Sequence, residues 1–376
     1  MICHYFAAGE CRSCVQLATP YPLQLEARQQ QLQQLLAPFS SVEIFPPVAS
    51  KPMHFRFKAK MVVMGTVAEP VLGIAQQQPV DLTACPLYPA EFVQAFAVIR
   101  SFIQQAKLQP YDIETKKGEL KYILLTRSYF SGRWLLRFVL RSQNHLAAIR
   151  KHLPELLRQW PELEVCSVNL QPDHKAVIEG DVELILTETQ MLAEQLNDVP
   201  LYLQPQGFFQ TNPELAAKLY QTARDWTADL PLQQVWDLFC GVGGFGLHLA
   251  QQGRKITGIE ISAAAIACAS KSAQQLQLTD FSFQALDAAT FATAQQQPPD
   301  LLVVNPPRRG LGDQLCQTVM RLQPDWLLYS SCNPSTLQSD LLLLNDYQLV
   351  KAQLFDFFPH TGHAEVLCLL RLKNRN

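Results

Sequence analysis

The amino-acid sequence predicts an α/β protein with an N-terminal α+β domain and a C-terminal doubly wound sheet. Three observations lead to this prediction. A glycine-rich turn joins a short apolar run to a helical pattern at residues 235–250. After this turn, apolar runs and helical patterns alternate to the end of the chain, which is typical of parallel sheets. Before residue 200 the pattern is mostly strand-like, with few helical stretches.

Length and composition agree with this organisation. A chain of 376 residues fits two domains, and we place the boundary near residue 200, giving domains 1–200 and 201–376. A hydrophobic content of 48% with 17% charged residues indicates a globular protein and excludes a disordered one. The sequence shows neither a signal peptide nor an apolar run of about 18 residues, so we expect no membrane span and a cytoplasmic location.

The net charge of −2 conceals an uneven distribution of charge. Residues 51–151 contain 15 Lys and Arg but 6 Asp and Glu, whereas residues 206–376 contain 12 and 14. A basic segment in an otherwise neutral protein indicates a local binding surface for a polyanion. The ordinary alternative is a set of solvated strand faces.

Within this basic segment, residues 54–62 alternate basic and apolar side chains. A period of two places Arg56, Lys58 and Lys60 on one face of a strand. Residues 121–127 and 133–141 repeat the pattern. A sheet with basic and aromatic residues on one face can bind RNA, and we expect helices near 91–105 and 145–159 to cover its other face.

Four of the ten cysteines lie in the first quarter of the chain. Cys3, Cys11 and Cys14 form a Cys-x7-Cys-x2-Cys pattern, and Cys85 can supply a fourth thiolate. Disulfides are uncommon in cytosolic proteins, and residues 1–14 lack the apolar periodicity of a core segment. Four thiolates suit zinc and an iron–sulfur cluster equally well, so we predict a metal site of either kind.

The glycine-rich turn has the features of a binding site for a nucleoside-containing cofactor. Its glycines can adopt positive φ, and the N–H groups at the start of the following helix suit a polar ligand. No lysine follows the glycines, which excludes a phosphate-binding P-loop. Asp237 precedes the turn, and Glu260 ends the next apolar run, where a carboxylate can bind ribose hydroxyls. The spacing resembles the S-adenosylmethionine turn of class I methyltransferases, in which Asp237 would face the methionine amino group; a dinucleotide site is the alternative.

The remaining elements are predicted from the same periodicities. Residues 25–37 read as an amphipathic helix with four leucines facing inward and glutamines outward, and a second helix is expected at 214–226. The last two strands follow each other without a helix, which predicts an antiparallel pair at the sheet edge. The inward leucines are Leu25, Leu32, Leu35 and Leu36, and the strands are expected at 234–239, 255–260, 281–285, 300–304, 326–331, 347–356 and 364–372.

Three polar stretches follow later strands, at the edge where such sheets place their sites. They carry Asn305 before two prolines, Cys332 after two serines, and Glu365 after a Phe-Pro-His-Thr-Gly-His-Ala run. Each has an ordinary explanation: a loop terminator, an inert cysteine and a surface glutamate. One reaction, however, uses a thiolate that adds to C6 of uracil and a carboxylate that removes the C5 proton. Arg308 is suitably placed to orient or polarise the base.

Five motifs together resemble those of the RNA 5-methyluridine methyltransferases. They occur in family order and the resemblance covers nearly the whole chain. The motifs are Phe-Phe-Gln-Thr-Asn, Asp-Leu-Phe-Cys-Gly-x-Gly-Gly-Phe, Asn-Pro-Pro-Arg-x-Gly, Ser-Ser-Cys-Asn-Pro and Phe-Pro-x-Thr-x-His-x-Glu.

This resemblance implies S-adenosylmethionine-dependent methylation of uracil C5 in 23S ribosomal RNA, with uridine 747 as the nearest match, by a monomer. It implies that Cys332 is the nucleophile and Glu365 the general base. It further implies cofactor contacts and a [4Fe-4S] cluster. The cofactor-binding positions are Gln210, Phe239, Glu260 and Asn305, and the cluster ligands are Cys3, Cys11, Cys14 and Cys85.

The chain departs from the family pattern in two places. Many relatives have Asp where this chain has Asn305. Larger relatives begin with a small RNA-binding barrel, for which Cys3 leaves no room, so we expect residues 51–151 to contact the RNA. Two other functions remain open: methylation of an exocyclic amine, which would have no use for Cys332, and RNA binding by a metal-stabilised protein with a vestigial catalytic domain.

Overall fold

The computed structural model describes residues 1–39, 42–76, 78–174 and 178–373, and these residues form two compact units. The first unit contains residues 1–13, 53–194 and 204–206, and the second contains 14–52, 195–203 and 207–376. A single division at residue 200 therefore does not describe the structure, because the N-terminal segment 14–52 belongs with the C-terminal unit. In the described parts of the chain, no helix is long and apolar enough to cross a membrane.

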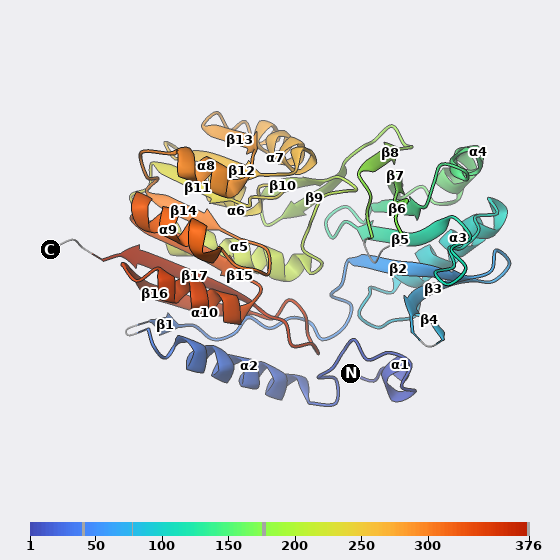
Figure 1. Ribbon diagram of the computed structural model, residues 1–376, viewed down its shortest axis with the longest axis horizontal. Helices are drawn as coiled ribbons and strands as arrows, with labels where there is room; N and C mark the ends of the chain where they lie inside the picture. The colour runs from blue at the N-terminus through green and yellow to red at the C-terminus, as the bar shows by residue number, and fades with distance from the viewer. Residues whose placement is uncertain (40–41, 77, 175–177, 374–376) are drawn as a thin grey trace. The chain divides into compact units, whose positions relative to one another are not determined.

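The first unit is a seven-stranded sheet with the strand order β4-β3-β2-β5-β6-β7-β8 (Figure 1). Its strands pair antiparallel except β6 and β7, which pair parallel and are joined by a helical crossover. The strands are β2 (Lys58–Gly65), β3 (Pro70–Ala75), β4 (Pro79–Asp81), β5 (Leu120–Arg127), β6 (Trp134–Leu140), β7 (Leu163–Leu170) and β8 (Val182–Ile185); the helices are α1 (His4–Ala7), α3 (Glu91–Gln105) and α4 (Leu146–Gln159).

Helices α3 and α4 share one hydrophobic core with one face of this sheet. Along β2, Ala59, Met61 and Val63 are buried in that core, whereas Lys58 is half-buried and Lys60 exposed. The predicted alternation is therefore confirmed for residues 58–62, as are the two covering helices, whereas residues 54–57, with Arg56, precede the strand.

The opposite face of the sheet is not an open cationic surface. Arg137 in β6 is fully buried and forms ion pairs with Glu179 and Glu183. Lys121 is also buried, and its ammonium group donates to oxygens of Gln171 and Asp173. A charge that is buried and paired in this way does not bind phosphates, so part of the predicted RNA face is structural.

The second unit contains an eight-stranded sheet with the order β1-β16-β17-β15-β14-β11-β12-β13. Strands β13, β12, β11, β14 and β15 are parallel to one another. Strand β17 lies between β15 and β16 and runs antiparallel to both. The strands are β1 (Glu43–Ile44), β11 (Gln234–Leu238), β12 (Lys255–Glu260), β13 (Phe281–Ala285), β14 (Leu301–Val304), β15 (Trp326–Ser331), β16 (Tyr347–Phe355) and β17 (Glu365–Leu372).

All seven strands expected after residue 200 are present, each within one residue of its predicted bounds. The antiparallel pairing of the last two is confirmed, but their position at the sheet edge is wrong. Strand β1 pairs parallel with β16 and forms the edge instead. It has two residues and therefore no detectable periodicity in the sequence.

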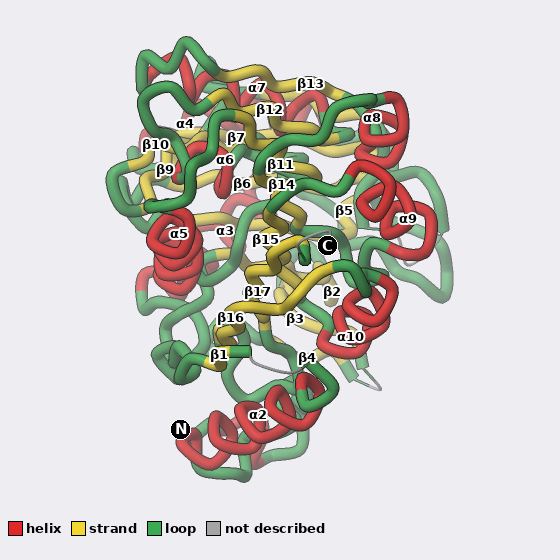
Figure 2. The backbone as a smooth tube through the Cα atoms, turned by 90° about the vertical axis from the view of Figure 1, so that its left-hand side faces the viewer, coloured by secondary structure: helices red, strands yellow, loops and turns green. Residues whose placement is uncertain are grey.

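Helices cover both faces of this sheet. Helices α2, α8, α9 and α10 share one hydrophobic core with the sheet. Figure 2 shows α5 on the side of the sheet opposite α8, α9 and α10, and α5 contacts α6, which contacts α7. The helices are α2 (Tyr21–Leu36), α5 (Pro213–Thr227), α6 (Gly244–His248), α7 (Ala263–Gln275), α8 (Ala288–Ala294), α9 (Gly312–Leu322) and α10 (Pro334–Leu343); β9 (Leu192–Leu196) and β10 (Val199–Leu203) form a separate two-stranded sheet.

Helix α2 buries a different stripe from the one predicted. Leu32 and Leu36 lie in the core as expected, and Leu25 and Leu35 pack partly against it. The buried stripe continues through two polar residues, Gln24 and Arg28. Glutamine and arginine are mostly exposed in proteins, and the predicted inward stripe contained leucines alone, so burial of these two residues was not expected.

Candidate active site

The turn after β11 has the backbone strain of a ligand-binding loop. Phe239 has φ of 62°, a left-handed conformation that is uncommon for a residue with a side chain, and Gly243 has φ of 84°. At the start of α6, a Cβ on Gly244 would lie 2.5 Å from the Tyr220 ring. Glycine at this position therefore lets Tyr220 pack against the turn.

Asp237, the third buried residue of β11, carries an unsatisfied oxygen. Its Oδ2 accepts a hydrogen bond from the Gly246 N–H at 2.8 Å, whereas Oδ1 is buried and has no partner among the described residues. Burial raises the pKa of this carboxyl to about 7, against the lowering effect of the Gly246 bond. A buried oxygen without a donor costs free energy, and a bound ammonium group would satisfy it. The site therefore fits the amino group of S-adenosylmethionine.

Glu260 ends β12 beside this turn. Its Oε2 accepts from the Gly241 N–H at 3.3 Å and its Oε1 from the Ser262 N–H at 3.0 Å. Ile261, the next residue, is 76% exposed. An acid that is hydrogen-bonded to the glycine turn, with an exposed apolar side chain next to it, can hold a ribose and the face of an adenine.

Asn305 and Gln210, the other two cofactor positions predicted from the sequence, lie in two different segments of the chain. Asn305 follows β14 and is half-buried, and its N–H bonds to the Leu238 carbonyl at 3.4 Å. Phe239, Glu260 and Asn305 thus stand at the ends of three neighbouring parallel strands. Gln210 is half-buried in the segment that precedes α5.

Cys332 and Glu365 meet at the same edge of the sheet. Cys332 directly follows β15, and Glu365 is the first residue of β17, whose antiparallel register pairs Ser331 with Val366. Ser330 donates a hydrogen bond from its hydroxyl to Glu365 Oε1. The sheet register therefore brings together two residues that are 33 positions apart in the sequence.

Burial and charge set the ionisation of this pair. Burial raises the pKa of Glu365 to about 7, although the Ser330 hydroxyl lowers it. Burial also raises the pKa of the Cys332 thiol, and the negative charge of Glu365 raises it further. The Arg308 guanidinium acts in the opposite direction, by its charge and by a hydrogen bond. Arg308 is thus the group that favours the thiolate.

Arg308 is held in turn by His363. One guanidinium nitrogen lies 3.1 Å from His363 Nδ1 and 3.2 Å from Nε2. Burial and the Arg308 charge lower the pKa of His363, which favours the neutral ring that can accept a hydrogen bond. His363 belongs to a motif quoted from the sequence, but the sequence assigned it no role.

Asp340 anchors the loop that carries Arg308, and no sequence signal identified it. From α10, its carboxylate accepts hydrogen bonds from the N–H groups of Leu311 and Gly312 and from the Tyr329 hydroxyl, at 2.8, 3.2 and 2.6 Å. A Cβ on Gly310 would lie 2.5 Å from Asp340 Oδ2. The glycine that follows the two arginines therefore lets the loop close onto this carboxylate.

The N-terminal cysteines were the other predicted site. In the first unit, Cys3, Cys11 and Cys85 carry free thiols, are half-buried and pack beside the hydrophobic core. Burial raises the pKa of Cys85 to about 11, and Cys3 and Cys11 contribute to this rise. Cys14 is the first residue of the second unit. Within the described ranges, no three or more His, Cys, Asp or Glu side chains are grouped so as to hold a metal ion.

The opposing effects on Cys332 predict how its reactivity depends on pH. Replacing Arg308 by Gln removes the charge that lowers the thiol pKa, so the midpoint of Cys332 alkylation should move to higher pH. Glu365→Gln removes a charge that raises it, so the midpoint should move to lower pH. Iodoacetamide labelling of the Cys332 peptide, followed by mass spectrometry between pH 6 and pH 11, measures both shifts.

The neighbouring arginine offers a matched control for this experiment. Arg309 acts on the pKa of Asp287, not on that of Cys332. Arg309→Gln should therefore keep the wild-type midpoint. Equal midpoints for Arg308→Gln and the wild type would contradict the role of Arg308.

Known proteins resemble this chain over nearly its full length. The tRNA (Uracil-5-)-methyltransferase family matches residues 20–373. The 23S rRNA (uracil(747)-C(5))-methyltransferase RlmC of Pectobacterium atrosepticum is 52% identical over 373 residues, which are 99% of this chain and 100% of that protein. The protein of the same name from Serratia proteamaculans is 54% identical and covers 98% of this chain and 99% of its own length.

A solved structure shows the same fold. The tRNA (uracil-54, C5)-methyltransferase of Pyrococcus abyssi, in complex with S-adenosyl-L-homocysteine, superposes with a TM-score of 0.80 at 25% identity. The match covers 95% of this chain and 85% of that one. Fold and sequence agree, and the chain belongs to the tRNA (uracil-5-)-methyltransferase family.

Proposed function

We propose that this protein transfers the methyl group of S-adenosylmethionine to C5 of a uridine in 23S ribosomal RNA, with uridine 747 as its target. Relatives with 52% and 54% identity over nearly the whole chain carry names that specify this reaction. The observation that carries the proposal is the coupling of Cys332, Glu365 and Arg308 at one edge of the sheet. Methylation of an exocyclic amine would have no use for a thiol coupled to a buried carboxyl.

In the proposed mechanism, the Cys332 thiolate adds to C6 of the uracil and makes C5 an enolate carbon. S-adenosylmethionine supplies the methyl group that C5 takes. Glu365 then removes the remaining C5 proton, and the bond between C6 and the Cys332 sulfur breaks to release 5-methyluridine and the thiolate. The thiol and the methyl donor approach the ring from different faces, so the target uridine has to leave its base stack.

The ionisation of the two groups supports these roles. A carboxyl with a pKa of about 7 can accept a proton near neutral pH and return it to water, which suits a general base. Because the carboxylate is the active form, the rate of proton removal should rise as the pH increases through 7. Arg308 would stabilise the thiolate before attack and could afterwards polarise a uracil carbonyl.

For the cofactor, we propose that Asp237 binds the amino group and Glu260 the ribose hydroxyls. The unsatisfied Oδ1 of Asp237 supports the first assignment. Gln210, Phe239 and Asn305 would complete the cofactor site. An amide at Asn305 can donate as well as accept a hydrogen bond, so the cofactor contact does not require a carboxylate there.

For the RNA, we propose a contact at the tip of the β5–β6 hairpin. Tyr129 and Phe130 are 44% and 61% exposed, and the Glu194 carboxylate accepts hydrogen bonds from both of their N–H groups at 2.8 and 2.9 Å. Two aromatic side chains on a backbone that is fixed in this way can stack on unpaired bases. Arg133, at the base of the hairpin, adds positive charge.

We further propose that Cys3, Cys11, Cys14 and Cys85 bind a [4Fe-4S] cluster. Support comes from the three half-buried free thiols of the first unit and from the effect of Cys3 and Cys11 on the pKa of Cys85, which reflects their proximity. The methyl transfer itself moves no net electrons, so the cluster would be structural or contribute to RNA recognition. We expect the protein to act as a monomer in the cytoplasm, where ribosomal RNA is modified.

A methyl-transfer assay with labelled S-adenosylmethionine and unmodified 23S ribosomal RNA tests the reaction. We expect one 5-methyluridine, at position 747. Cys332→Ala should abolish turnover while cofactor binding persists. Glu365→Gln should trap a covalent complex of protein and RNA, visible on a denaturing gel, because the thiolate cannot leave before the C5 proton does.

Other results would overturn the assignment. A methyl label on an exocyclic amine would show that the reaction is amine methylation and not C5 methylation. RNA binding without any methyl transfer would favour an RNA-binding protein without catalytic activity. A Glu365→Gln variant that turns over without a trapped complex would remove Glu365 as the base.

A stacking role for the hairpin predicts weaker RNA binding when its exposed ring is removed. Phe130→Ala should raise the KM for RNA about 5-fold or more, since one stacked base contributes about 1–3 kcal/mol. The KM for S-adenosylmethionine should not change. Val93→Ala removes another exposed apolar side chain of the same unit, on α3, and should bind RNA normally. Equal RNA affinities for the two variants would refute the contact.

The cluster proposal predicts the metal content of the protein. Protein purified without oxygen should contain iron and sulfide and show broad visible absorption. Cys11→Ala should lose the iron and lower the thermal midpoint. Cys166→Ala, which changes a fully buried cysteine of the same unit, should keep the iron. Zinc in place of iron, or full iron retention by Cys11→Ala, would contradict the proposal.

A further inference from the structure

A short turn connects the last two strands of the second unit and leads directly into Glu365. It comprises residues 356–364, between the end of β16 and the start of β17. Within it, His360 has φ of 66°, a left-handed conformation that a residue with a Cβ adopts only when its surroundings hold it there. The turn therefore needs partners outside its own sequence.

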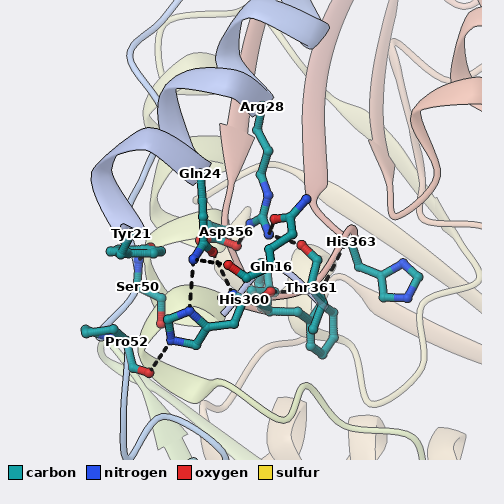
Figure 3. A network of polar contacts seen from close by, with 12 residues as sticks. Gln16, Tyr21, Gln24, Arg28, Ser50, Pro52, Asp356, His360, Thr361 and His363 are labelled. Atoms are coloured by element: carbon teal, nitrogen blue, oxygen red, sulfur yellow. Dashed lines mark hydrogen bonds and ion pairs between the residues drawn. The ribbon is translucent and has the colours of Figure 1, made fainter. Parts of the chain in front are cut away.

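Helix α2 supplies those partners from more than 300 positions away (Figure 3). Arg28 is 5% exposed and forms an ion pair with the fully buried Asp356 at the start of the turn. The same guanidinium donates to the Thr361 carbonyl and, at 3.0 Å, to the side chain of Gln16. One buried arginine thus joins both halves of the turn.

Gln24, one helical turn before Arg28, holds His360 at two points. Its side-chain oxygen accepts from the His360 N–H at 3.0 Å. Its nitrogen lies 3.1 Å from His360 Nδ1 and is shared with the carbonyls of Thr19 and Gln16, at 2.7 and 3.0 Å. His360 Nε2 lies 2.9 Å from the Pro52 carbonyl. The Nε2 atom must carry the proton that this carbonyl accepts, so Nδ1 is left to accept from Gln24. Every polar group of His360 is matched, because the Gln16 N–H also donates to its carbonyl at 2.9 Å.

The other half of α2 anchors the helix itself. Leu32 and Leu36 continue the stripe of Gln24 and Arg28 and are buried in the core beneath the sheet. The helix therefore has an apolar half that fixes its position and a polar half that contacts the turn. This division explains why the buried stripe includes two residues that are usually exposed.

The geometry of Glu365 makes this contact relevant to the reaction. As the first residue of β17, Glu365 pairs with Phe355 of β16 on one side. The residues after it pair on both sides, whereas those before it belong to the turn. The backbones of the Cys332 and Arg308 loops are anchored outside the turn, by Asn333 and Asp340, although the Arg308 guanidinium also contacts His363 within it. A displaced turn would therefore move Glu365 more than it moves Cys332.

We propose that Gln24 and Arg28 are positioning residues that hold the 356–364 turn and, through it, the general base Glu365. This inference rests on the proposed function and adds helix α2 to the residues that support the reaction. Loss of the α2 contacts would slow removal of the C5 proton more than it slows the addition of Cys332 to the base and methyl transfer. The covalent complex of Cys332 with methylated RNA would then accumulate.

The test uses the full-length protein with unmodified 23S ribosomal RNA and labelled S-adenosylmethionine. Gln24→Met removes both contacts with His360, together with the bonds to the Thr19 and Gln16 carbonyls, but buries no unpaired charge. Arg28→Lys keeps a positive charge beside Asp356 but replaces two separate guanidinium nitrogens, one on Asp356 and one on Thr361 and Gln16, by a single nitrogen. We expect each variant to lower kcat about 10-fold or more, to leave the KM for S-adenosylmethionine within about 2-fold, and to raise the fraction of covalent complex on a denaturing gel.

Gln29→Met is a matched control, because it changes the same residue type on the same helix. Gln29 donates to the Phe45 carbonyl at 3.1 Å, which lies outside the 356–364 turn. It should keep the wild-type kcat and the wild-type level of complex. A Gln24→Met protein that behaves like Gln29→Met would overturn the positioning role. The positioning role would also be overturned if each variant lost activity only in proportion to its loss of folded protein and formed no additional covalent complex. The contacts would then be structural. A wild-type protein that forms no 5-methyluridine would instead refute the proposed function.

Discussion

The antiparallel insertion of β17 between β15 and β16 is the constraint on which the candidate active site depends. Parallel strands place their carboxyl ends at one edge of a sheet, so β11, β12, β14 and β15 deliver their loops there. An antiparallel strand in the same sheet begins at that edge. Its first residue therefore joins loops that follow other strands, and in this chain that residue is Glu365, beside Cys332.

Burial determines the chemistry of this edge more than any single charge pair does. Desolvation is the largest influence on the pKa values of Asp237, Glu365 and Cys332, and it disfavours the charged form of each. The opposing hydrogen bonds are few: one N–H for Asp237 and one hydroxyl for Glu365. Two carboxyls are consequently left near pKa 7, so the site can exchange protons near neutral pH. Structural carboxylates such as Asp340, by contrast, accept several hydrogen bonds.

The N-terminal segment 14–52 changes how the second unit should be understood. It adds β1 to the edge of the sheet and α2 to one of its faces, and α2 supplies a buried arginine to the turn before Glu365. Breaking a buried ion pair by removing one partner typically costs about 3–5 kcal/mol, so Arg28 and Asp356 constrain each other strongly. The unit is therefore discontinuous in sequence, and a fragment beginning after residue 200 would lack part of its own sheet and core.

Local sequence determined the strands and the loops that carry the candidate residues. The alternation of apolar runs with helical patterns predicted β12, β13 and β15 at their observed bounds, and Cys332 and Asn305 follow strands as expected. Tertiary structure alone decided the rest, because it depends on contacts between distant residues. The two residues of β1 have no periodicity, and Gln24 and Arg28 are of residue types that are usually exposed. The pattern that exposes Lys60 on its strand likewise does not reveal the carboxylates that pair with the buried Arg137. The ionisation of the site residues was also decided by tertiary structure. The pKa of Glu365 is raised because the assembled sheet buries it, and no local sequence pattern encodes this burial.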